Sequence, residues 1–378
     1  MKKKKLAIIC ASWEQLPLVE KAKEMGIETH CFAWDKEGYT DCKGVADFFH
    51  PISILEKEQI LKVCKDIKID GITSCNNDLA ISTVAYVAEN MGLIGNRYAD
   101  TMITSNDKYE SRQAMFKNGV NSPRFVVARE GQVPNLNGFK YPLIVKPVDR
   151  SGSVGVMKVD TEAELHEAIL RAQQLSYSGK AIIEEFIIGV EVSVESISWN
   201  GIHYNLALTD KVTTNEPYHV EIAHHEPSEL SEEIQEKVKT EARKALTAVN
   251  YNYGASDTEI KITDNGDVYI IEVNARLGGD FTYEMVKLST GYDFLKGVID
   301  VALNQFEVPV LIEHMYSGIY YLCKENEWVK HVIENKENYP EITEAVITKE
   351  ELSLIQYSGD RSGYFIYKSD RKMIREEF

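Results

Sequence analysis

Short apolar runs alternate with amphipathic segments along the first 110 residues, and this alternation restricts the fold more than any other feature of the sequence. Residues 6–10 (LAIIC) are predicted to form a buried strand, residues 16–25 a helix that Gly26 ends, and residues 29–33 the next strand. A helix, a strand and a helix are then predicted at 58–66, 71–74 and 79–90. Because such units form parallel sheets covered by helices on both faces, we expect an α/β, Rossmann-like domain here.

The turn after the first predicted strand has the sequence Cys10-Ala11-Ser12-Trp13. A dinucleotide pyrophosphate needs glycines at this turn, so that the backbone can approach it closely. The turn has none, and the sequence therefore argues against an NAD or FAD site at this position.

The sequence changes in character after Asn121-Ser122-Pro123, and the regular alternation of strands and helices stops. Helices are predicted at 162–172 and 232–249. Strands are predicted at 143–146, 181–185, 191–199, 203–210, 258–262 and 268–274. This order predicts an α+β region rather than a second parallel sheet.

The charge balance and the cysteines restrict partners and location. The chain has 42 lysines and arginines against 59 aspartates and glutamates, a net charge of −17, which disfavours nucleic acid and anionic membranes as partners. None of the six cysteines forms a CxxC pair, so we expect buried free thiols. The apolar stretch at 6–11 is too short for a signal peptide or a membrane span. We therefore expect a reducing, cytoplasmic setting.

Two glutamates are predicted to face each other on a hairpin over residues 258–274. Asn265-Gly266 suits a two-residue type I′ turn, which would place Glu259 opposite Glu272 with Cβ atoms about 5 Å apart. Asn274 lies on the same face as Glu272, because side chains alternate along a strand. Two mutually repelling carboxylates and an amide oxygen form a hard-oxygen site suited to Mg²⁺, which takes further ligands from phosphates and water.

A solvated hairpin face is the alternative, with Glu259 paired to Lys261 or another cation. A slip of one residue in register would turn one glutamate to the opposite face. The hairpin residues alone therefore leave metal binding open.

Arg276 continues the alternation of Glu272 and Asn274, so its guanidinium could clamp a transferring phosphoryl group or simply balance the carboxylates. Gly278-Gly279 then allows a close backbone approach to a ligand.

A second phosphate-binding candidate is Lys146 with the small-residue loop 149–155 (DRSGSVG). Backbone N–H groups of such a loop can surround phosphate oxygens, and the lysine adds a point charge. The loop lacks GxxxxGK[ST] and is not a Walker A motif, and a plain hairpin is the alternative.

Two further segments are candidates for ligand contacts. The stretch 184–191 (EEFIIGVE) suits a purine ring and a ribose hydroxyl, with a strand–turn–strand bearing exposed glutamates as the alternative. In the segment that follows Lys211, His224 and His225 point to opposite faces of a strand, which disfavours zinc. His224 is instead a candidate contact to phosphate or substrate.

In combination and in this order, these segments resemble the ATP-grasp superfamily over residues 1–305. The resemblance rests most on TDKVTTNEPYHVEIAHHEPS (209–228), SDTEIKI (256–262) and IIEVNARLGGDF (270–281). It is strongest to the branch with L-amino acid ligases and biotin carboxylase-like proteins. The resemblance implies a parallel-sheet domain at 1–110, an ATP-grasp domain whose two α+β lobes clamp ATP at 111–305, with a lid lobe at about 121–190, and a small C-terminal α+β segment at 306–378.

The resemblance also implies roles for individual residues. Phosphate contacts and the lid over the phosphates fall on Lys108, Lys146, Ser151, Gly152 and Ser153. Contacts to adenine and ribose fall on Glu184, Glu185, Phe186, Ile187 and Glu191. Ligands of Mg²⁺, with Mn²⁺ as the alternative ion, fall on Glu259, Glu272 and Asn274. Catalytic contacts to the transferred phosphate and the substrate fall on Arg276, Lys146, Lys211 and His224.

The implied activity is that of an ADP-forming ligase acting on small molecules. A substrate carboxylate attacks the γ-phosphate of ATP, and an amine, for example of an amino acid, displaces phosphate from the acylphosphate. The short segment beyond residue 305 and the absence of Met-Lys-Met disfavour biotin carboxylation. The alternatives are a transformylase or carboxylase-type enzyme, an ATP-binding regulatory module without turnover, and an interaction protein with a basic partner. The oligomeric state stays open, and the resemblance implies a homodimer because many relatives are dimers.

Overall fold

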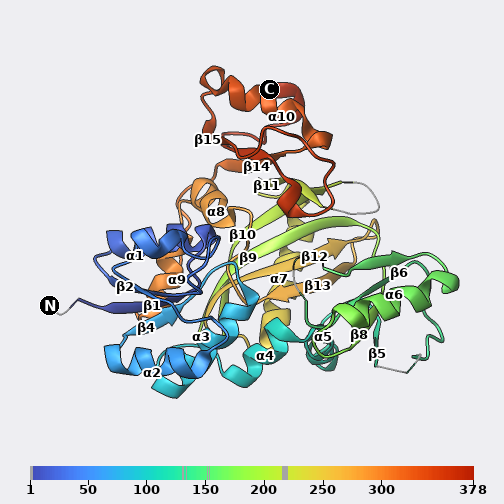
Figure 1. Ribbon diagram of the computed structural model, residues 1–378. Coiled ribbons are helices and arrows are strands. Elements are labelled where there is room, and N and C mark those ends of the chain that lie inside the picture. The colour runs from blue at the N-terminus through green and yellow to red at the C-terminus, as the bar shows by residue number, and fades with distance from the viewer. Residues whose placement is uncertain (1–2, 130–131, 133, 151, 153, 215–219) are drawn as a thin grey trace.

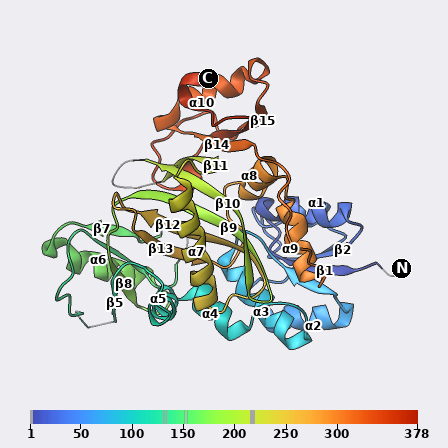
Figure 2. The same cartoon turned by 180° about the vertical axis from the view of Figure 1, so that it is seen from behind.

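The structure of the chain is a computed structural model that describes all residues except 1–2, 130–131, 133, 151, 153 and 215–219 (Figures 1 and 2). Within the described residues, the strands form three sheets. The predicted order, an N-terminal parallel sheet followed by α+β architecture, is confirmed.

The N-terminal sheet is parallel, with the strand order β3-β2-β1-β4. Its strands are β1 (Lys5–Ile9), β2 (Glu28–Phe32), β3 (Phe48–His50) and β4 (Gly71–Thr73). The helices of this part are α1 (Leu16–Glu24), α2 (Lys57–Ile67), α3 (Asp78–Met91), α4 (Tyr98–Asn106) and α5 (Lys108–Lys117).

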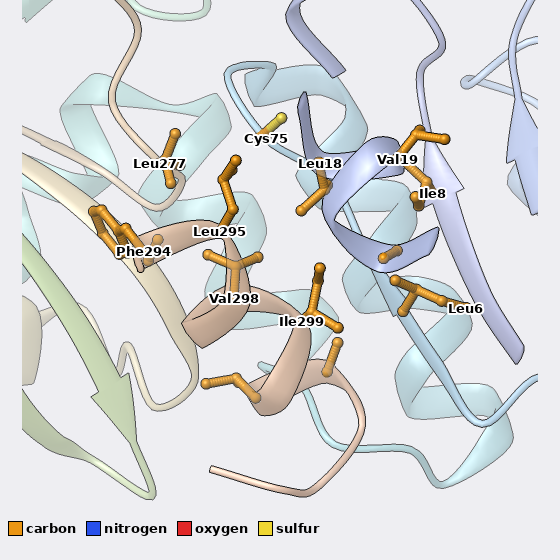
Figure 3. Close-up of a cluster of buried hydrophobic side chains, with 14 of the residues drawn as sticks. Leu6, Ile8, Leu18, Val19, Cys75, Leu277, Phe294, Leu295, Val298 and Ile299 are labelled. Atoms are coloured by element: carbon orange, nitrogen blue, oxygen red, sulfur yellow. The ribbon is translucent and has the colours of Figure 1, made fainter. Parts of the chain in front are cut away.

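Alternate residues of β1 enter two hydrophobic cores, as the pleat of a strand requires. Ala7 and Ile9 pack against α2 and α3. Leu6 and Ile8 pack on the other face against α1 and against α9 (Phe294–Ala302), a helix from far along the chain (Figure 3). The packing of α9 therefore anchors the N-terminal sheet to the rest of the molecule.

The central sheet has eight strands in the order β13-β12-β9-β10-β11-β14-β16-β15, all paired antiparallel. Its first five strands in chain order are β9 (Val190–Trp199), β10 (Ile202–Thr213), β11 (Glu221–Glu226), β12 (Gly254–Ile262) and β13 (Val268–Asn274). Helix α7 (Glu232–Ala248) crosses one face of this sheet (Figure 2). Val192, Val194 and Ile260 point toward α7, so the residues between them point to the opposite face.

A third sheet, with the order β5-β8-β6-β7, forms a separate lobe with α6 (Glu162–Leu175) (Figure 1). Its strands are β5 (Phe125–Ala128), β6 (Leu143–Pro147), β7 (Met157–Val159) and β8 (Ala181–Glu185).

The last part of the chain extends the central sheet through β14 (Tyr316–Leu322), β16 (Gly363–Ser369) and β15 (Ile342–Ile347), with α8 (Thr282–Thr290) and α10 (Trp328–Glu334) beside them. The domain limits at 110 and 305 stay predictions, and the first of them falls inside α5. Among the described residues, no helix is long and apolar enough to cross a membrane.

Candidate active site

Glu259 and Glu272 are paired directly across β12 and β13, as the sequence predicts, but the turn between them is not the predicted one. Only Gly266 of the two turn residues has a positive φ, +75°, and its N–H donates to the Thr263 carbonyl at 2.8 Å. Next to the turn, Ile262 pairs with Val268, one residue out of the predicted register. The prediction of a type I′ turn was therefore wrong.

A β-bulge at Ile271 restores the pairing of the glutamates. Val268, Ile270 and Val273 all lie in the core under α7, so without the extra residue Glu272 would point into that core. The Arg112 guanidinium donates to the Ile271 carbonyl at 2.6 Å, which satisfies a backbone group that the bulge takes out of the ladder.

Each glutamate accepts a hydrogen bond from a lysine. Lys108 Nζ lies 2.6 Å from Glu272 Oε1, and Lys211 Nζ lies 3.1 Å from Glu259 Oε1. Burial raises the pKa of Glu272, but Lys108 and Lys146 lower it further, to about 2. Lys211 lowers the pKa of Glu259, yet burial and the charges of Asp257 and Glu272 outweigh it and raise this pKa to about 7. The pair therefore holds less than two full negative charges near neutral pH.

A second row of polar side chains lies beside the glutamates on the same face. Asp257 pairs with Asn274 on β13 and with Glu195 on β9. Asn274 Nδ2 lies 3.3 Å from Asp257 Oδ2, while Asp257 Oδ1 and Glu195 Oε2 are buried without a hydrogen-bond partner among the described residues. Sequence reasoning missed Asp257 and Glu195, although the alternation from Glu259 indicates the face of Asp257.

The residues around the glutamate pair fit a divalent cation that completes its shell from elsewhere. The donors are hard oxygens, and Asp257 Oδ1 is an orphaned acceptor beside Asn274. No group of three or more histidine, cysteine, aspartate or glutamate residues is arranged as a metal site within the described part of the chain. Metal binding by Glu259, Glu272 and Asn274 therefore stays a prediction that depends on phosphate oxygens and water.

Glu184 bridges two cations at the base of the lid lobe. Its Oε1 accepts from Arg112 Nε at 2.5 Å and its Oε2 lies 2.7 Å from Lys146 Nζ. All three residues are buried, so this network fixes where the Lys146 ammonium lies. The Glu184 carboxylate is engaged with these cations, and the predicted contact to adenine by its side chain stays untested.

The predicted adenine segment follows Glu184. The ammonium groups of Lys158 and Lys261 lie over the Phe186 ring, 5.3 and 5.2 Å from its centroid. Gly189 lies against β12, where an added Cβ would come within 2.1 Å of the Ile262 carbonyl oxygen. Glu191 pairs with Lys211 at 3.4 Å. The side chain of Glu185 accepts from the Lys140 N–H at 3.3 Å, and Ile187 follows Phe186 on the same segment.

The predicted lid loop is described only in part. Ser151 and Ser153 lie outside the described residues. Gly152 has φ +63° and an open surrounding, so its backbone is free to approach a ligand. Asp149 anchors the start of the loop by accepting from the N–H groups of Tyr177 and Ser178 at 3.0 and 2.8 Å.

Arg276 is held by the N-terminal part of the molecule. Its Nε donates to Asp78 Oδ1 at 2.9 Å, and Asp78 is the first residue of α3, just beyond the carboxyl end of β4. Burial lowers the pKa of Arg276, but Asp78 and Asp257 raise it above its ordinary value, so the guanidinium is cationic. Sequence reasoning missed Asp78, although ligands of open parallel sheets bind at the carboxyl ends of the strands.

His224 and Arg361 lie on the side of Lys211 that is away from the glutamate pair. His224 pairs with Lys211 across β10 and β11, and neither ring nitrogen of this buried histidine has a hydrogen-bond partner among the described residues. Burial lowers the pKa of His224 to about 4, although Asp280 acts in the opposite direction, so the ring is neutral. Arg361 donates to Asp280 Oδ1 at 2.6 Å and lies over the Tyr321 ring, 3.7 Å from its centroid.

The chain matches the ATP-grasp domain family over residues 139–284, a span that contains Lys146, the glutamate pair and Arg276. The chain contains an ATP-grasp domain. This finding agrees with the expected fold, and the roles of the individual residues remain proposals.

Curated relatives and solved structures are similar to the chain over different lengths. It is 31% identical to alanine–anticapsin ligase of Bacillus subtilis (strain 168) over 297 residues, which is 68% of this chain and 62% of that protein. It is also 31% identical to D-alanine–D-alanine ligase of Acetivibrio thermocellus over 192 residues, 47% of this chain and 50% of that protein. The chain therefore spans less than two thirds of the length of these relatives.

Two solved structures share the fold over nearly the whole chain. Phosphoribosylglycinamide synthetase from Anaerococcus prevotii has a TM-score of 0.78 at 25% identity, with 98% of this chain and 95% of that chain covered. L-amino acid ligase from Bacillus licheniformis has a TM-score of 0.81 at 23% identity, with 98% and 94% covered.

Proposed function

We propose that the chain is an ATP-dependent, ADP-forming ligase that activates a substrate carboxylate as an acylphosphate and joins it to an amine. The observation that carries this proposal is the opposed pair Glu259 and Glu272, with Lys108 on one carboxylate and Lys211 on the other. The similarity to alanine–anticapsin ligase and D-alanine–D-alanine ligase supports an amino acid as substrate.

In this proposal the chain's charged groups bind and orient the nucleotide. Glu259, Glu272 and Asn274 would hold Mg²⁺, which when bound neutralises charge on the phosphates. Lys146, fixed by Glu184, and Lys108 would contact phosphate oxygens. Both lysines are already ion-paired with glutamates in the free protein. When phosphate and metal bind, the lysines pair with phosphate and Glu272 pairs with the metal, so no buried charge is left without a partner.

The first chemical step needs little proton transfer, since a carboxylate is already ionised at pH 7. A carboxylate oxygen forms a bond to the γ-phosphorus while the bond to the β-phosphate oxygen breaks, and ADP leaves. Arg276, held by Asp78, would stabilise the charge on the transferred group. The amine nitrogen then attacks the acyl carbon, loses a proton, and inorganic phosphate leaves.

The acylphosphate must be kept from water, which a closing lid accomplishes. We assign this role to the loop 149–155, which contains Gly152. On the opposite side, His224 and Lys211 would contact the substrates, because the His224 ring is neutral and buried and its nitrogens have no hydrogen-bond partner among the described residues.

The proposal also concerns the cellular compartment and the oligomeric state of the protein. The six cysteines are all buried and unpaired, which supports a reducing, cytoplasmic compartment. We further propose a homodimer, which light scattering of the purified chain tests directly.

A phosphate-release screen with Mg-ATP and amino acids, singly and in pairs, tests the proposed function, with mass spectrometry of the products. We expect phosphate release that depends on two substrates and a product joined by an amide bond. Glu272→Ala and Arg276→Ala should abolish release without unfolding the chain. Glu241→Gln is the control, because this carboxylate lies on α7 behind the sheet. Release without a joined product would favour another acceptor, and ATP binding without release would favour a regulatory module.

A further inference from the structure

The N-terminal sheet has a topological switch point between β1 and β4. The chain leaves β1 toward β2 and β3 on one side, and β4 then pairs with β1 on the other side. In open parallel sheets, ligands bind in the crevice outside the carboxyl ends of the strands at such a point. From this topology we expect such a crevice between the segment after β1, with Trp13 and Glu14, and the segment after β4, with Asp78.

This crevice adjoins the candidate active site. Asp78 accepts from Arg276 at 2.9 Å. Glu14 interacts electrostatically with two residues of the same site. Burial raises the pKa of Glu14 above its ordinary value, the charge of Arg276 lowers it, and the charge of Asp280 raises it. A ligand in the crevice would therefore lie beside the guanidinium to which phosphate chemistry is assigned above.

One wall of the crevice is aromatic and open. The Trp13 side chain is 60% exposed, although indole is among the groups that gain most from burial. Its ring centroid lies 6.1 Å from that of Phe281, which in turn lies 4.4 Å from that of Tyr364. This wall brings together the N-terminal part, the turn after β13 and the C-terminal strand β16.

The backbone at Phe281 is held in an unfavourable conformation. Asp280 and Phe281 both have positive φ, +57° and +61°, which is rare for a bulky residue. In this conformation Asp280 meets Arg361 at 2.6 Å and Phe281 meets Trp13. Such a strained backbone conformation persists only where the surrounding structure enforces it, and it occurs often at ligand-binding sites.

We propose that Trp13 and Phe281 form the side-chain subsite for one substrate, and that this substrate is an amino acid with a large apolar or aromatic side chain. This proposal rests on the ligase function proposed above. An apolar wall that faces a row of charged groups suits a ligand with an apolar side chain and a charged main-chain end. Arg276, Asp280 and Arg361 form the charged side of the site, and Trp13 and Phe281 the apolar side.

Tryptophan fluorescence tests the subsite without turnover. We expect leucine, methionine or isoleucine, added to the full chain with Mg-ADP, to shift the emission to shorter wavelength, because the bound side chain removes water from Trp13. Glycine should not produce this shift, and Trp13→Phe should remove it. No shift with any of the three amino acids, or an equal shift with glycine, would overturn the subsite.

Steady-state ADP release separates the subsite from the ligase proposal. In Trp13→Ala, the ratio of KM for phenylalanine to KM for glycine should rise about tenfold, the value expected for losing part of an indole contact. Trp13→Phe should recover most of the ratio. Phe116→Ala is the control, because Phe116 is 70% exposed on α5 and contacts the ring of Phe125. An equal change for both amino acids would refute the subsite alone, whereas no ADP release by the wild type with any pair would refute the ligase function.

Discussion

The Asp78–Arg276 ion pair makes a sharp prediction, because it joins the N-terminal part of the molecule to the residue assigned to the transferred phosphate. Asp78 Oδ1 and Arg276 Nε are 2.9 Å apart, and the two side chains are only 15% and 17% exposed. Asp78→Asn keeps the shape of the side chain and removes its charge. Arg276 then loses its charged partner, and the amide oxygen of asparagine can accept only a weaker hydrogen bond from the guanidinium.

A hydrogen bond between two charged groups contributes about 1.5–3 kcal/mol and is roughly twice as strong as one with a neutral partner, so a loss of about half of it, felt only in the transition state, lowers kcat about 4- to 12-fold. We expect this decrease in ADP release at saturating Mg-ATP and substrates, with the KM for ATP nearly unchanged. Because both side chains are largely buried, the loss of one charge should also lower thermal stability, so kcat is measured at a temperature at which the variant stays folded.

Asp100→Asn is the control for this prediction. Asp100 lies in α4 and pairs at 4.0 Å with Arg97, whose side chain is 73% exposed, and its loss should leave kcat unchanged. Full kcat in Asp78→Asn, or tighter nucleotide binding at full kcat, would show that Asp78 restrains Arg276 rather than positioning it.

Two other perturbations give measurable outcomes. Glu226 is fully buried, and burial raises its pKa to about 7 despite hydrogen bonds from Thr209 and Ser289. Between pH 4.5 and 7 the folded chain keeps a proton on Glu226 that the unfolded chain releases, so the free energy of unfolding falls as pH rises. The variant Glu226→Gln does not lose this proton. Measured by urea denaturation, its stability relative to the wild type should therefore be about 3 kcal/mol greater at pH 8 than at pH 5. Equal differences at both pH values would refute the raised pKa. Gly189→Ala would place a Cβ 2.1 Å from the Ile262 carbonyl oxygen, and it should destabilise the chain by about 1–3 kcal/mol and weaken ADP binding. The control Gly44→Ala meets nothing within 4 Å, and equal effects of the two variants would contradict the close approach at Gly189.

The hairpin of β12 and β13 illustrates how far the sequence predicts the site. The sequence correctly predicts Glu259 opposite Glu272, although the register was counted from a type I′ turn that the structure does not have. The predicted turn was one residue too short, and the bulge at Ile271 compensates for this error. Arg112, far away in the sequence, takes the Ile271 carbonyl at 2.6 Å, and local patterns contain no information on such a contact.

Asp78 and Arg361 were missed for the same reason, because each contacts a site residue that is far away in the sequence. Asp78 reaches Arg276 only because α9 packs on the N-terminal sheet and fixes it against the central one. Arg361 reaches Asp280 because β14 and β16 extend the central sheet. By contrast, the alternating strands and helices of the first 110 residues predicted the parallel sheet correctly, because that signal is local.

The proposed metal site at Glu259 and Glu272 is tested most directly by anomalous scattering from crystals grown with Mn²⁺ and ADP. We predict one peak about 2.1 Å from a carboxylate oxygen of each glutamate, the distance typical of a hard cation and oxygen, with Lys108 Nζ displaced from Glu272. The absence of a peak between the two carboxylates, with the 2.6 Å contact between Lys108 and Glu272 still intact, would contradict the site.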